Sequence, residues 1–481
     1  MAAHTSADSY RRGVELAEAG KYEEGWNCLR EHLHGAPQDV PALNDAGVIL
    51  HHLGRAEEAI GLLTKARRLQ DNPEIVCNLV EAHLGGGRAA EAARLFDDME
   101  RMGTLSIDVL NRTATMLLDE GRKGQAIEVL LRSHRLWPQQ EELRPILDGI
   151  RSKRPKVAFF RHGAGEDGIS AGVGELVQQR FQTEFYDGRT PGEIGRLMEW
   201  SDIAWFDGGG DGIVEASRQA GRHKIVASVR CSDVRDRWPQ EVRWENVDIL
   251  AQIGSSAVED VLLGQVPEIR SRTRLAVVPN GVNLKRYPFR RRKRGKHLAC
   301  IGDLTLEANP AFLLQCMQKL HSFDAGCRLF FSGPFENPVL EQYLRHMIRV
   351  LNLTGWLSDK HFLVAAGMAE SHVETLLAGM ACGVKPVVHG FPGADKLLGP
   401  QYLFHIAEQF CEQVLSTDYQ PRHYRRFVEE HHSVEQQLKR VDEILTGLET
   451  EIERQTEAPL GRKASATRNH PGVPVAGDGV K

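Results

Sequence analysis

A motif that recurs every 33 or 34 residues constrains the first third of the chain more than any other feature. Four related stretches occur, AGKYEEG, LGRAEEA, GGRAAEA and EGRKGQA. Their glycines, Gly20, Gly54, Gly87 and Gly121, are separated by 34, 33 and 34 residues. Each glycine lies between two helical patterns, and glycine ends a helix readily because it tolerates the left-handed conformation. The period therefore predicts stacked helix pairs over residues 1–150.

This pattern resembles the tetratricopeptide repeat. The resemblance implies an α-solenoid, in which each helix pair buries its apolar face against the next and leaves a concave groove. Such grooves typically bind peptides or protein segments, so a protein is the expected partner of residues 1–150. The alternative is an arm that serves only as a spacer or for dimerisation.

Length, charge and cysteine content restrict the remaining possibilities. A chain of 481 residues is too long for one ordinary core. A formal net charge of -5 argues against a nucleic-acid partner and against attraction to an anionic membrane surface. The charged N-terminus and the lack of a long apolar run predict a cytoplasmic protein without stable membrane insertion. The eight cysteines form no CxxC pair, so reduced thiols are expected, with no metal site and no cofactor.

Beyond residue 155 short apolar runs alternate with helical patterns. The first set of predicted strands lies at 156–160, 202–206, 224–229, 248–253 and 275–279. The second set lies at 297–302, 327–333, 361–367 and 385–390. Such alternation predicts two doubly wound parallel sheets with helices on both faces. We expect domains at 155–285 and 297–450 and a disordered tail, rich in proline and glycine, at 455–481.

Two loops are candidate ligand sites on position alone. His162, Gly163 and Gly165 follow the first strand, where ligands of doubly wound sheets bind. This loop lacks the ending of a Walker motif and a clean GxGxxG, so a dinucleotide site is not favoured. His162 is a candidate base on the acceptor side, or a merely exposed loop histidine, and the glycines have a turn as their alternative role. Composition favours a solvated linker for the basic run at 290–296, with a phosphate contact as its alternative role.

Several stretches resemble the retaining glycosyltransferases of the GT-B fold, family 4 type. They are VVPNGVNLKRYPF, CIGDL, FFSGPFENPVLEQYL and ESHVETLLAGMACGVKPVVHGFPGADKLL, and the resemblance covers roughly 155–450. It implies an α/β GT-B fold of two doubly wound Rossmann-like domains, with the acceptor on the first. A nucleotide-diphosphate sugar would be the co-substrate of the second.

The same resemblance assigns residues. Glu370 matches the first acid of an E-x7-E motif, which contacts the transferred sugar, so it is the expected catalytic residue. A carboxylate there accepts hydroxyl hydrogen bonds and stabilises an oxocarbenium-like transition state. Backbone amides after it face the donor phosphates. The expected donor-binding residues are Gly302, Ser371, His372, Val373 and Glu374. Without the resemblance, Glu370 is a helix N-terminal acid favoured by the dipole, and Glu374 is a solvent-facing helix acid.

The chain departs from the family pattern at three positions. The second acid, which holds the nucleotide ribose, corresponds to Ala378, and two cations that neutralise the diphosphate correspond to Asp303 and Ala308. Lys385 or an arginine of 290–294 could replace the cations, and Glu374 could serve the ribose.

The leading hypothesis is therefore a glycosyltransferase whose repeat arm recruits a protein acceptor or partner. The alternative is a catalytically degenerate scaffold that binds partners through its repeats. A nucleotide-binding regulator is a weaker third hypothesis, because no phosphate loop of standard type occurs.

Overall fold

The computed structural model divides into two compact units, Met1–Arg154 and Pro155–Lys481. The residues that the structure describes are 2–161, 169–186, 192–219, 221, 223–231, 233–350, 360–368 and 373–457.

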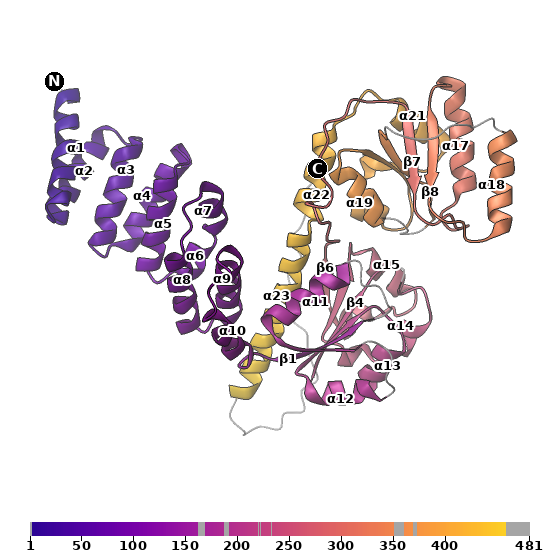
Figure 1. The fold of residues 1–481 in the computed structure, drawn as a ribbon, viewed down its shortest axis with the longest axis horizontal. Helices are drawn as coiled ribbons and strands as arrows, with labels where there is room; N and C mark the ends of the chain where they lie inside the picture. Colours follow the sequence, from indigo (N-terminus) through magenta and orange to yellow (C-terminus); the bar gives the residue numbers. More distant parts are fainter. Residues whose placement is uncertain are drawn as a thin grey trace. The chain divides into compact units, whose positions relative to one another are not determined.

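The first unit is built from consecutive helices that pack as pairs (Figure 1). They are α1 (Ala2–Glu18), α2 (Tyr22–Gly35), α3 (Val40–His52), α4 (Ala56–Leu69), α5 (Pro73–Gly85), α6 (Ala89–Ala93), α7 (Phe96–Met102), α8 (Ile107–Asp119), α9 (Lys123–Leu136) and α10 (Leu143–Arg151). Buried leucines, alanines and valines from neighbouring pairs form continuous cores, so each pair is stabilised by the next.

The four repeat glycines end the first helices as the sequence predicts. Gly20, Gly54, Gly87 and Gly121 have φ of +76°, +73°, +68° and +75°. All four therefore occupy the left-handed conformation that favours glycine. The third repeat differs from the others, because its second helix is divided into α6 and α7.

The first sheet of the second unit is wholly parallel, in the order β2-β1-β3-β4-β5-β6. Its strands are β1 (Lys156–Arg161), β2 (Gln182–Tyr186), β3 (Ile203–Asp207), β4 (Lys224–Val229), β5 (Ile249–Ile253) and β6 (Arg274–Val278). Its helices are α11 (Ile169–Arg180), α12 (Glu193–Trp200), α13 (Asp211–Arg218), α14 (Trp238–Glu241), η1 (Trp244–Asn246), α15 (Ala257–Leu263) and α16 (Ile269–Arg272). The edge strand β2 was not predicted.

The second sheet is also parallel, in the order β11-β10-β9-β7-β8. Its strands are β7 (His297–Ile301), β8 (Arg328–Ser332), β9 (Phe362–Ala365), β10 (Lys385–His389) and β11 (Leu403–Phe404). The helices are α17 (Pro310–Phe323), α18 (Pro338–Val350), α19 (Val373–Ala381), α20 (Ala394–Leu398), η2 (Pro400–Tyr402), α21 (Ala407–Leu415), α22 (Pro421–His431) and α23 (Val434–Glu457). One core joins α19 and α22 to one face, and another joins α17 and α21 to the other face. The predicted fold class, an α-solenoid followed by two doubly wound Rossmann-like domains, is confirmed.

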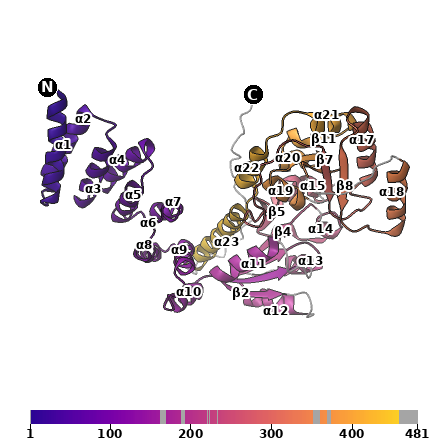
Figure 2. The ribbon, with the colours of Figure 1, turned by 45° about the horizontal axis from the view of Figure 1, so that its top comes forward.

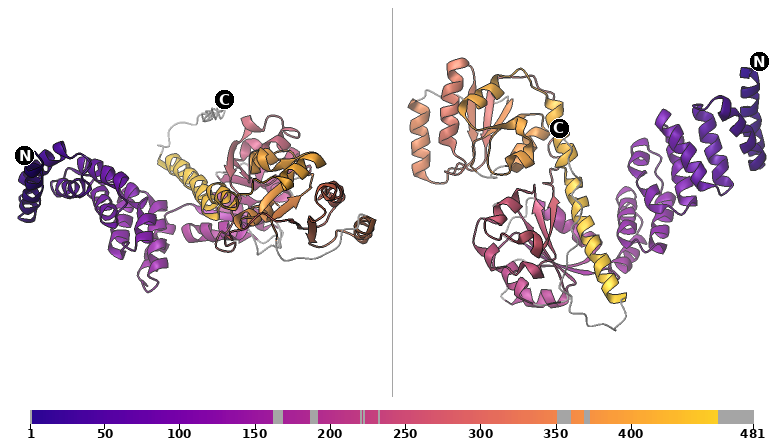
Figure 3. Two further views of the ribbon diagram at one scale, coloured as in Figure 1. Left: turned by 90° about the horizontal axis from the view of Figure 1, so that it is seen from above. Right: turned by 180° about the vertical axis from the view of Figure 1, so that it is seen from behind.

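The last helix returns to the first sheet (Figure 2 and the right view of Figure 3). Apolar residues of α23, among them Val441, Ile444 and Leu448, share a core with Val157 and Phe159 of β1. The predicted second domain, 297–450, therefore includes most of a helix that packs on the first sheet. An amphipathic helix pattern shows that one face must be covered, but it does not show which sheet covers it.

A buried charge network fastens α23 at the amino end of the first sheet. Nζ of Lys224 lies 3.0 Å from Asp248 Oδ1 and 2.9 Å from Glu451 Oε2. Arg274 also pairs with Glu451. Burial alone would raise the pKa of Glu451, but hydrogen bonds from Arg274 and Lys224 hold this pKa below its ordinary value. The stabilisation from Glu451 is therefore present above pH 4.5 and is lost as the pH falls below that value.

The chain passes twice between the domains, and the two passages are hydrogen bonded. The backbone N–H of Val282 donates to the carbonyl oxygen of His432 at 2.8 Å, and that of Val434 donates to Val282 at 3.1 Å. His432 is 4% exposed, and its Nε2 lies 3.2 Å from the carbonyl oxygen of Leu397. Burial lowers the pKa of His432 to about 4.

Acid is expected to weaken this junction through His432. Between pH 6.5 and about 4 the unfolded chain binds the proton and the folded chain does not, so stability falls as the pH falls through that window. The full loss is at most about 3 kcal/mol. Urea unfolding at about pH 7.5 and at about pH 5 should show a lower free energy of unfolding at the lower pH. The variant His432→Gln keeps a donor for Leu397 but does not titrate there, so its stability should change less. Equal pH dependence in both proteins would contradict the assignment.

Candidate functional site

The second sheet has its topological switch point between β7 and β9. From β7 the chain continues to β8 on one side, whereas β9 and β10 lie on the other. Ligands of doubly wound sheets bind outside the carboxyl ends of the strands at such a point. The residues that leave these strands there are Gly302 after β7 and Gly367 after β9. The predicted donor residue Gly302 therefore lies at the position where ligands are expected.

Glycine is required where the turns after β7 and β8 meet. Gly302 has φ of +131° and Gly333 has φ of +152°. A methyl group on Gly333 would lie 1.9 Å from the carbonyl oxygen of Gly302. The N–H of Gly302 donates to the carbonyl oxygen of Ser332 at 2.9 Å. Close approach of the two backbones thus shapes this edge of the sheet.

The segment 303–308 is held on both sides of the switch point. The N–H of Leu304 donates to Pro334 at 2.8 Å, and that of Met368 donates to Glu307 at 3.0 Å. Oγ1 of Thr305 accepts from the N–H of Ala308 at 3.0 Å. The segment therefore links the turn after β8 to the turn after β9.

Two helices begin at this edge. α17 begins at Pro310 after Asn309, whose φ of +48° is left-handed and whose side chain caps no helix N–H. α19 begins at Val373. The first N–H groups of a helix lack partners within the helix and attract anions, and the helix dipole adds to this attraction. Both helix starts therefore suit a phosphate at the switch point.

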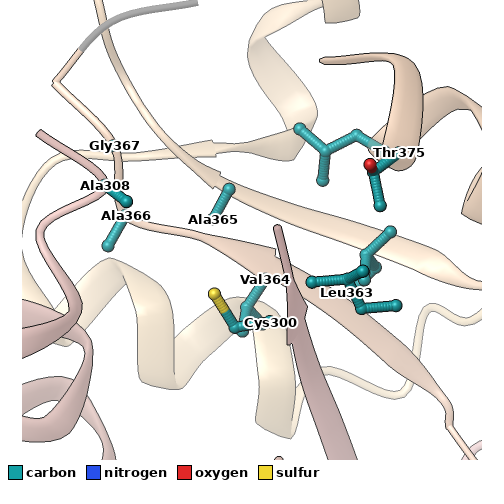
Figure 4. A pocket seen from close by; sticks show the side chains of 10 residues that line it. Cys300, Ala308, Leu363, Val364, Ala365, Ala366, Gly367 and Thr375 are labelled. Carbon is teal, nitrogen blue, oxygen red and sulfur yellow. The ribbon is translucent and has the colours of Figure 1, made fainter. Parts of the chain in front are cut away.

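Pockets lie beside α19. One lies beneath Thr375 and is lined by Cys300, Ala308, Ala366 and Gly367, among others (Figure 4). Burial raises the pKa of the Cys300 thiol to about 12, so this thiol is not a nucleophile at neutral pH.

A larger cavity of about 500 Å³ runs along α19. This volume lies in the range of small-molecule sites. Residues from α19, the linker and the sheet line it, namely Tyr287, Arg292, Ile301, Lys360, Leu363, Glu374, Thr375, Ala378, Gly379, Cys382 and Val384. Glu374 and Ala378, one helical turn apart, therefore share one cavity.

Only part of the predicted site lies within the described residues. Gly302, Val373 and Glu374 are described, with Val373 buried in the core and Glu374 exposed. The remaining predicted residues, Glu370, Ser371, His372, His162, Gly163 and Gly165, lie outside the described residues.

The basic run has a structural role that the sequence did not reveal. Arg292 donates to the carbonyl oxygen of Lys360 at 2.9 Å, and Arg294 donates to those of Val414 and Leu415 at 2.9 and 3.0 Å. The carbonyl groups of Val414 and Leu415 lie at the carboxyl end of α21, where a cation is favourable. Arg294 is therefore engaged away from the switch point, and Arg292, which lines the 500 Å³ cavity, is engaged there with the carbonyl oxygen of Lys360 at the amino end of β9.

Lys385 is also engaged elsewhere. Its Nζ donates to the carbonyl oxygens of Gln413 and Asp418, each at 3.0 Å, and burial lowers its pKa. Lys385 begins β10, so it lies at the amino end of a strand, opposite the switch point. The expectation that Lys385 replaces a phosphate-binding cation is therefore not supported by its position.

The sequence reasoning missed a turn at the switch point of the first sheet. The sheet order places this point between β1 and β3, and the run DGGGD at 207–211 follows β3. Gly208 and Gly210 have φ of +102° and +123°, and Ser228 donates to Oδ1 of Asp207 at 3.2 Å. Three consecutive glycines directly after a predicted strand were the signal that could have identified it.

Neither a metal site nor a membrane span emerges from the part of the chain that the structure describes. Within it, no group of three or more histidine, cysteine or acidic side chains is placed to hold a metal ion. No helix there is long and apolar enough to cross a bilayer. The eight cysteines, all within the described residues, form no disulfide bond.

The first unit carries one asparagine at equivalent positions of successive first helices. Nδ2 of Asn78 donates to Oδ1 of Asn44 at 2.9 Å, and Asn44 donates to Glu74 at 3.1 Å. Asn111 occupies the same position in the next repeat. Asn44 is buried and its amide is used within the row, whereas Asn78 and Asn111 are half-buried. Side-chain amides both donate and accept, so these two half-buried asparagines are suited to polar partners.

Comparison with known families supports the repeat assignment. Residues 10–73 match the family model described as tetratricopeptide repeat. The first unit contains tetratricopeptide repeats. The beta-barrel assembly-enhancing protease of Escherichia coli (strain K12) is 36% identical over 91 residues, which cover 19% of each chain. Tetratricopeptide repeat protein 17 of Danio rerio is 38% identical over 73 residues, covering 14% of this chain and 6% of that protein. The match thus spans about a fifth or less of these relatives' lengths.

Solved structures resemble the chain more broadly. A mutant O-GlcNAc transferase of Thermobaculum terrenum covers 94% of this chain and 99% of its own, with 12% identity and a TM-score of 0.42. The apo form of the lipopolysaccharide outer core galactosyltransferase WaaB covers 61% of this chain and 99% of its own, with 14% identity and a TM-score of 0.46. At these identities and TM-scores, the function beyond the tetratricopeptide-repeat domain has to be argued from this chain's own residues.

Proposed function

We propose that the second unit is a glycosyltransferase that moves a sugar from a nucleotide-diphosphate donor to an acceptor hydroxyl. The observation that carries this proposal is the switch point of the second sheet. Two helix starts and the glycine turns at Gly302 and Gly333 suit a diphosphate there. The 500 Å³ cavity along α19 adjoins the same edge and offers room for a nucleoside.

In this proposal the reaction proceeds with retention at the sugar. The bond between the anomeric carbon and the β-phosphate oxygen breaks, and its electron pair stays on the nucleoside diphosphate. The acceptor oxygen bonds to the anomeric carbon, and its proton passes to the departing phosphate. Glu370, which lies outside the described residues, is the carboxylate proposed to stabilise the oxocarbenium-like charge.

The tetratricopeptide-repeat domain is proposed to recruit a protein acceptor or partner. The half-buried asparagines Asn78 and Asn111, at equivalent positions of successive repeats, support this role, because side-chain amides complement the N–H and carbonyl groups of a peptide backbone. A chain whose eight cysteines form no disulfide bond is compatible with a cytoplasmic location, which is part of the proposal.

Glu374 is proposed to hold the ribose in place of the acid that Ala378 lacks. Both residues line the same cavity one helical turn apart, and Glu374 is exposed to it. A carboxylate can accept both ribose hydroxyls in charge-assisted hydrogen bonds.

Donor binding should therefore depend on Glu374. Calorimetric titration with UDP-, GDP- and TDP-sugars should find a donor, and Glu374→Gln should weaken its binding about tenfold or more. Glu412→Gln, an exposed acid on α21, is the matched control and should bind normally. Adding Ala378→Glu to Glu374→Gln should restore affinity. Normal donor affinity in Glu374→Gln would exclude this ribose contact.

A catalytically silent scaffold is the second candidate, favoured by one observation. Asp303 and Glu307 are exposed on the segment beside the proposed diphosphate site, where negative charge opposes an anion. If no nucleotide sugar raises the melting temperature of the full chain, the scaffold is the better description.

A further inference from the structure

A charged contact reaches the proposed diphosphate site from the first domain. Arg235, in the turn after β4, forms an ion pair with Glu307 of the segment 303–308. Glu307 lies between the turns after β7 and β9, because its carbonyl oxygen accepts the N–H of Met368. The guanidinium of Arg235 is therefore placed at the switch point of the second sheet.

The turn that carries Arg235 is firmly anchored. The neighbouring Val234 is 0% exposed, and its carbonyl oxygen accepts from Nε2 of Gln265 at 2.6 Å. Nε1 of Trp238 donates to the carbonyl oxygen of Asp233 at 2.6 Å, and Asp233 accepts from the N–H of Arg230 at 2.8 Å. An anchored backbone on both sides lowers the entropy lost when the side chain binds a ligand.

The charge at this site requires a cation. Asp303 and Glu307 carry negative charge beside the position proposed for the diphosphate, and Ala308 has no charge to offer. An anion bound there without a nearby cation would be repelled. Arg292, Arg294 and Lys385 are engaged with carbonyl oxygens elsewhere.

We propose that Arg235 binds the diphosphate of the nucleotide donor from the opposite domain. This inference rests on the proposed glycosyltransferase function. In the empty site Glu307 holds the guanidinium in position, and on donor binding the guanidinium exchanges Glu307 for phosphate oxygens. Guanidinium groups bind phosphate through paired N–H donors, so the exchange yields a stronger set of hydrogen bonds. The same contact stabilises the negative charge on the departing diphosphate.

The test compares nucleoside diphosphates with nucleosides by calorimetry on the full chain. The wild-type protein should bind UDP or GDP, and Arg235→Ala should weaken that binding at least about tenfold while leaving uridine or guanosine affinity unchanged. Arg237→Ala, an exposed arginine of the same turn, is the matched control and should bind normally.

The variant Glu307→Gln distinguishes phosphate binding by Arg235 from an ion pair that only stabilises the domain arrangement. If Arg235 binds phosphate, freeing it should leave nucleoside diphosphate affinity equal or higher, opposite in direction to Arg235→Ala. If the pair only fastens the two domains, both variants should weaken binding alike, and this result would overturn the inference. Unchanged diphosphate affinity in Arg235→Ala would also overturn it, with the proposed function intact. A wild-type protein that binds no nucleoside diphosphate would overturn both.

Discussion

Replacing Lys224 by methionine is expected to lower the free energy of unfolding of the second unit by about 3–5 kcal/mol. Lys224 and Asp248 are each 7% exposed, and Lys224 also pairs with Glu451 of α23. Methionine fills similar space but leaves the buried carboxylate of Asp248 without its cation, whereas Glu451 keeps its ion pair with Arg274. Uncompensated buried charge is among the most costly changes that a single substitution makes.

Urea unfolding of the full chain, followed by circular dichroism, measures this change. Lys319→Met is the matched control, because the Lys319–Glu408 pair is exposed to solvent and should contribute little to stability. Adding Asp248→Asn to Lys224→Met removes one unpaired charge, and an asparagine oxygen can still accept from the N–H of Ile225. The double variant should therefore recover part of the loss. A Lys224→Met protein as stable as Lys319→Met would show that the network does not fasten α23.

Gly333→Ala is expected to be the most damaging change at the candidate site. Its φ of +152° strains any other residue, and the added methyl group would lie 1.9 Å from the carbonyl oxygen of Gly302. The obstacle is backbone, so relief requires the turns after β7 and β8 to separate. We expect a loss of about 3 kcal/mol or more in stability, together with loss of nucleoside diphosphate binding.

Gly399→Ala isolates the part of this effect that comes from conformation alone. Gly399 has φ of +82°, and its nearest neighbour is the movable side-chain end of Gln401. This control should lose about 1–3 kcal/mol from its strained backbone conformation and keep its ligand. Thermal melts and UDP titrations of both variants decide the matter. Similar stability and intact binding in both would mean that the contact at Gly302 does not shape the site.

The sequence predicted the parts of the fold that depend on local chemistry. The repeat glycines identified the helix ends, because the left-handed conformation is a local requirement. The central strands were predicted because they are apolar throughout. Strand β2 (Gln182–Tyr186) was missed because its five residues are all half-buried and alternate weakly, and β11 was missed because it has two residues.

The candidate site was less predictable for a physical reason. Gly302 and Glu374 could be proposed as site residues because they flank strand and helix patterns that the sequence displays. Arg235 was missed because its significance depends on Glu307, 72 positions further along the chain. The arginines of 290–294 were visible in the sequence, but their role was not. Composition reveals their charge and does not reveal the carbonyl oxygens that accept hydrogen bonds from Arg292 and Arg294.

The return of α23 to the first sheet has a consequence for how the protein is made. The apolar face that includes Val157 and Phe159 is completed by Val441 and Leu445, which emerge from the ribosome after both sheets have been synthesised. During synthesis this face remains uncovered, so the first Rossmann-like domain cannot reach its final core before the last helix appears. The tetratricopeptide-repeat domain is complete much earlier, because its helices pack against near neighbours in the chain. A nascent chain stalled before residue 434 should therefore carry one folded domain and one exposed sheet that chaperones recognise.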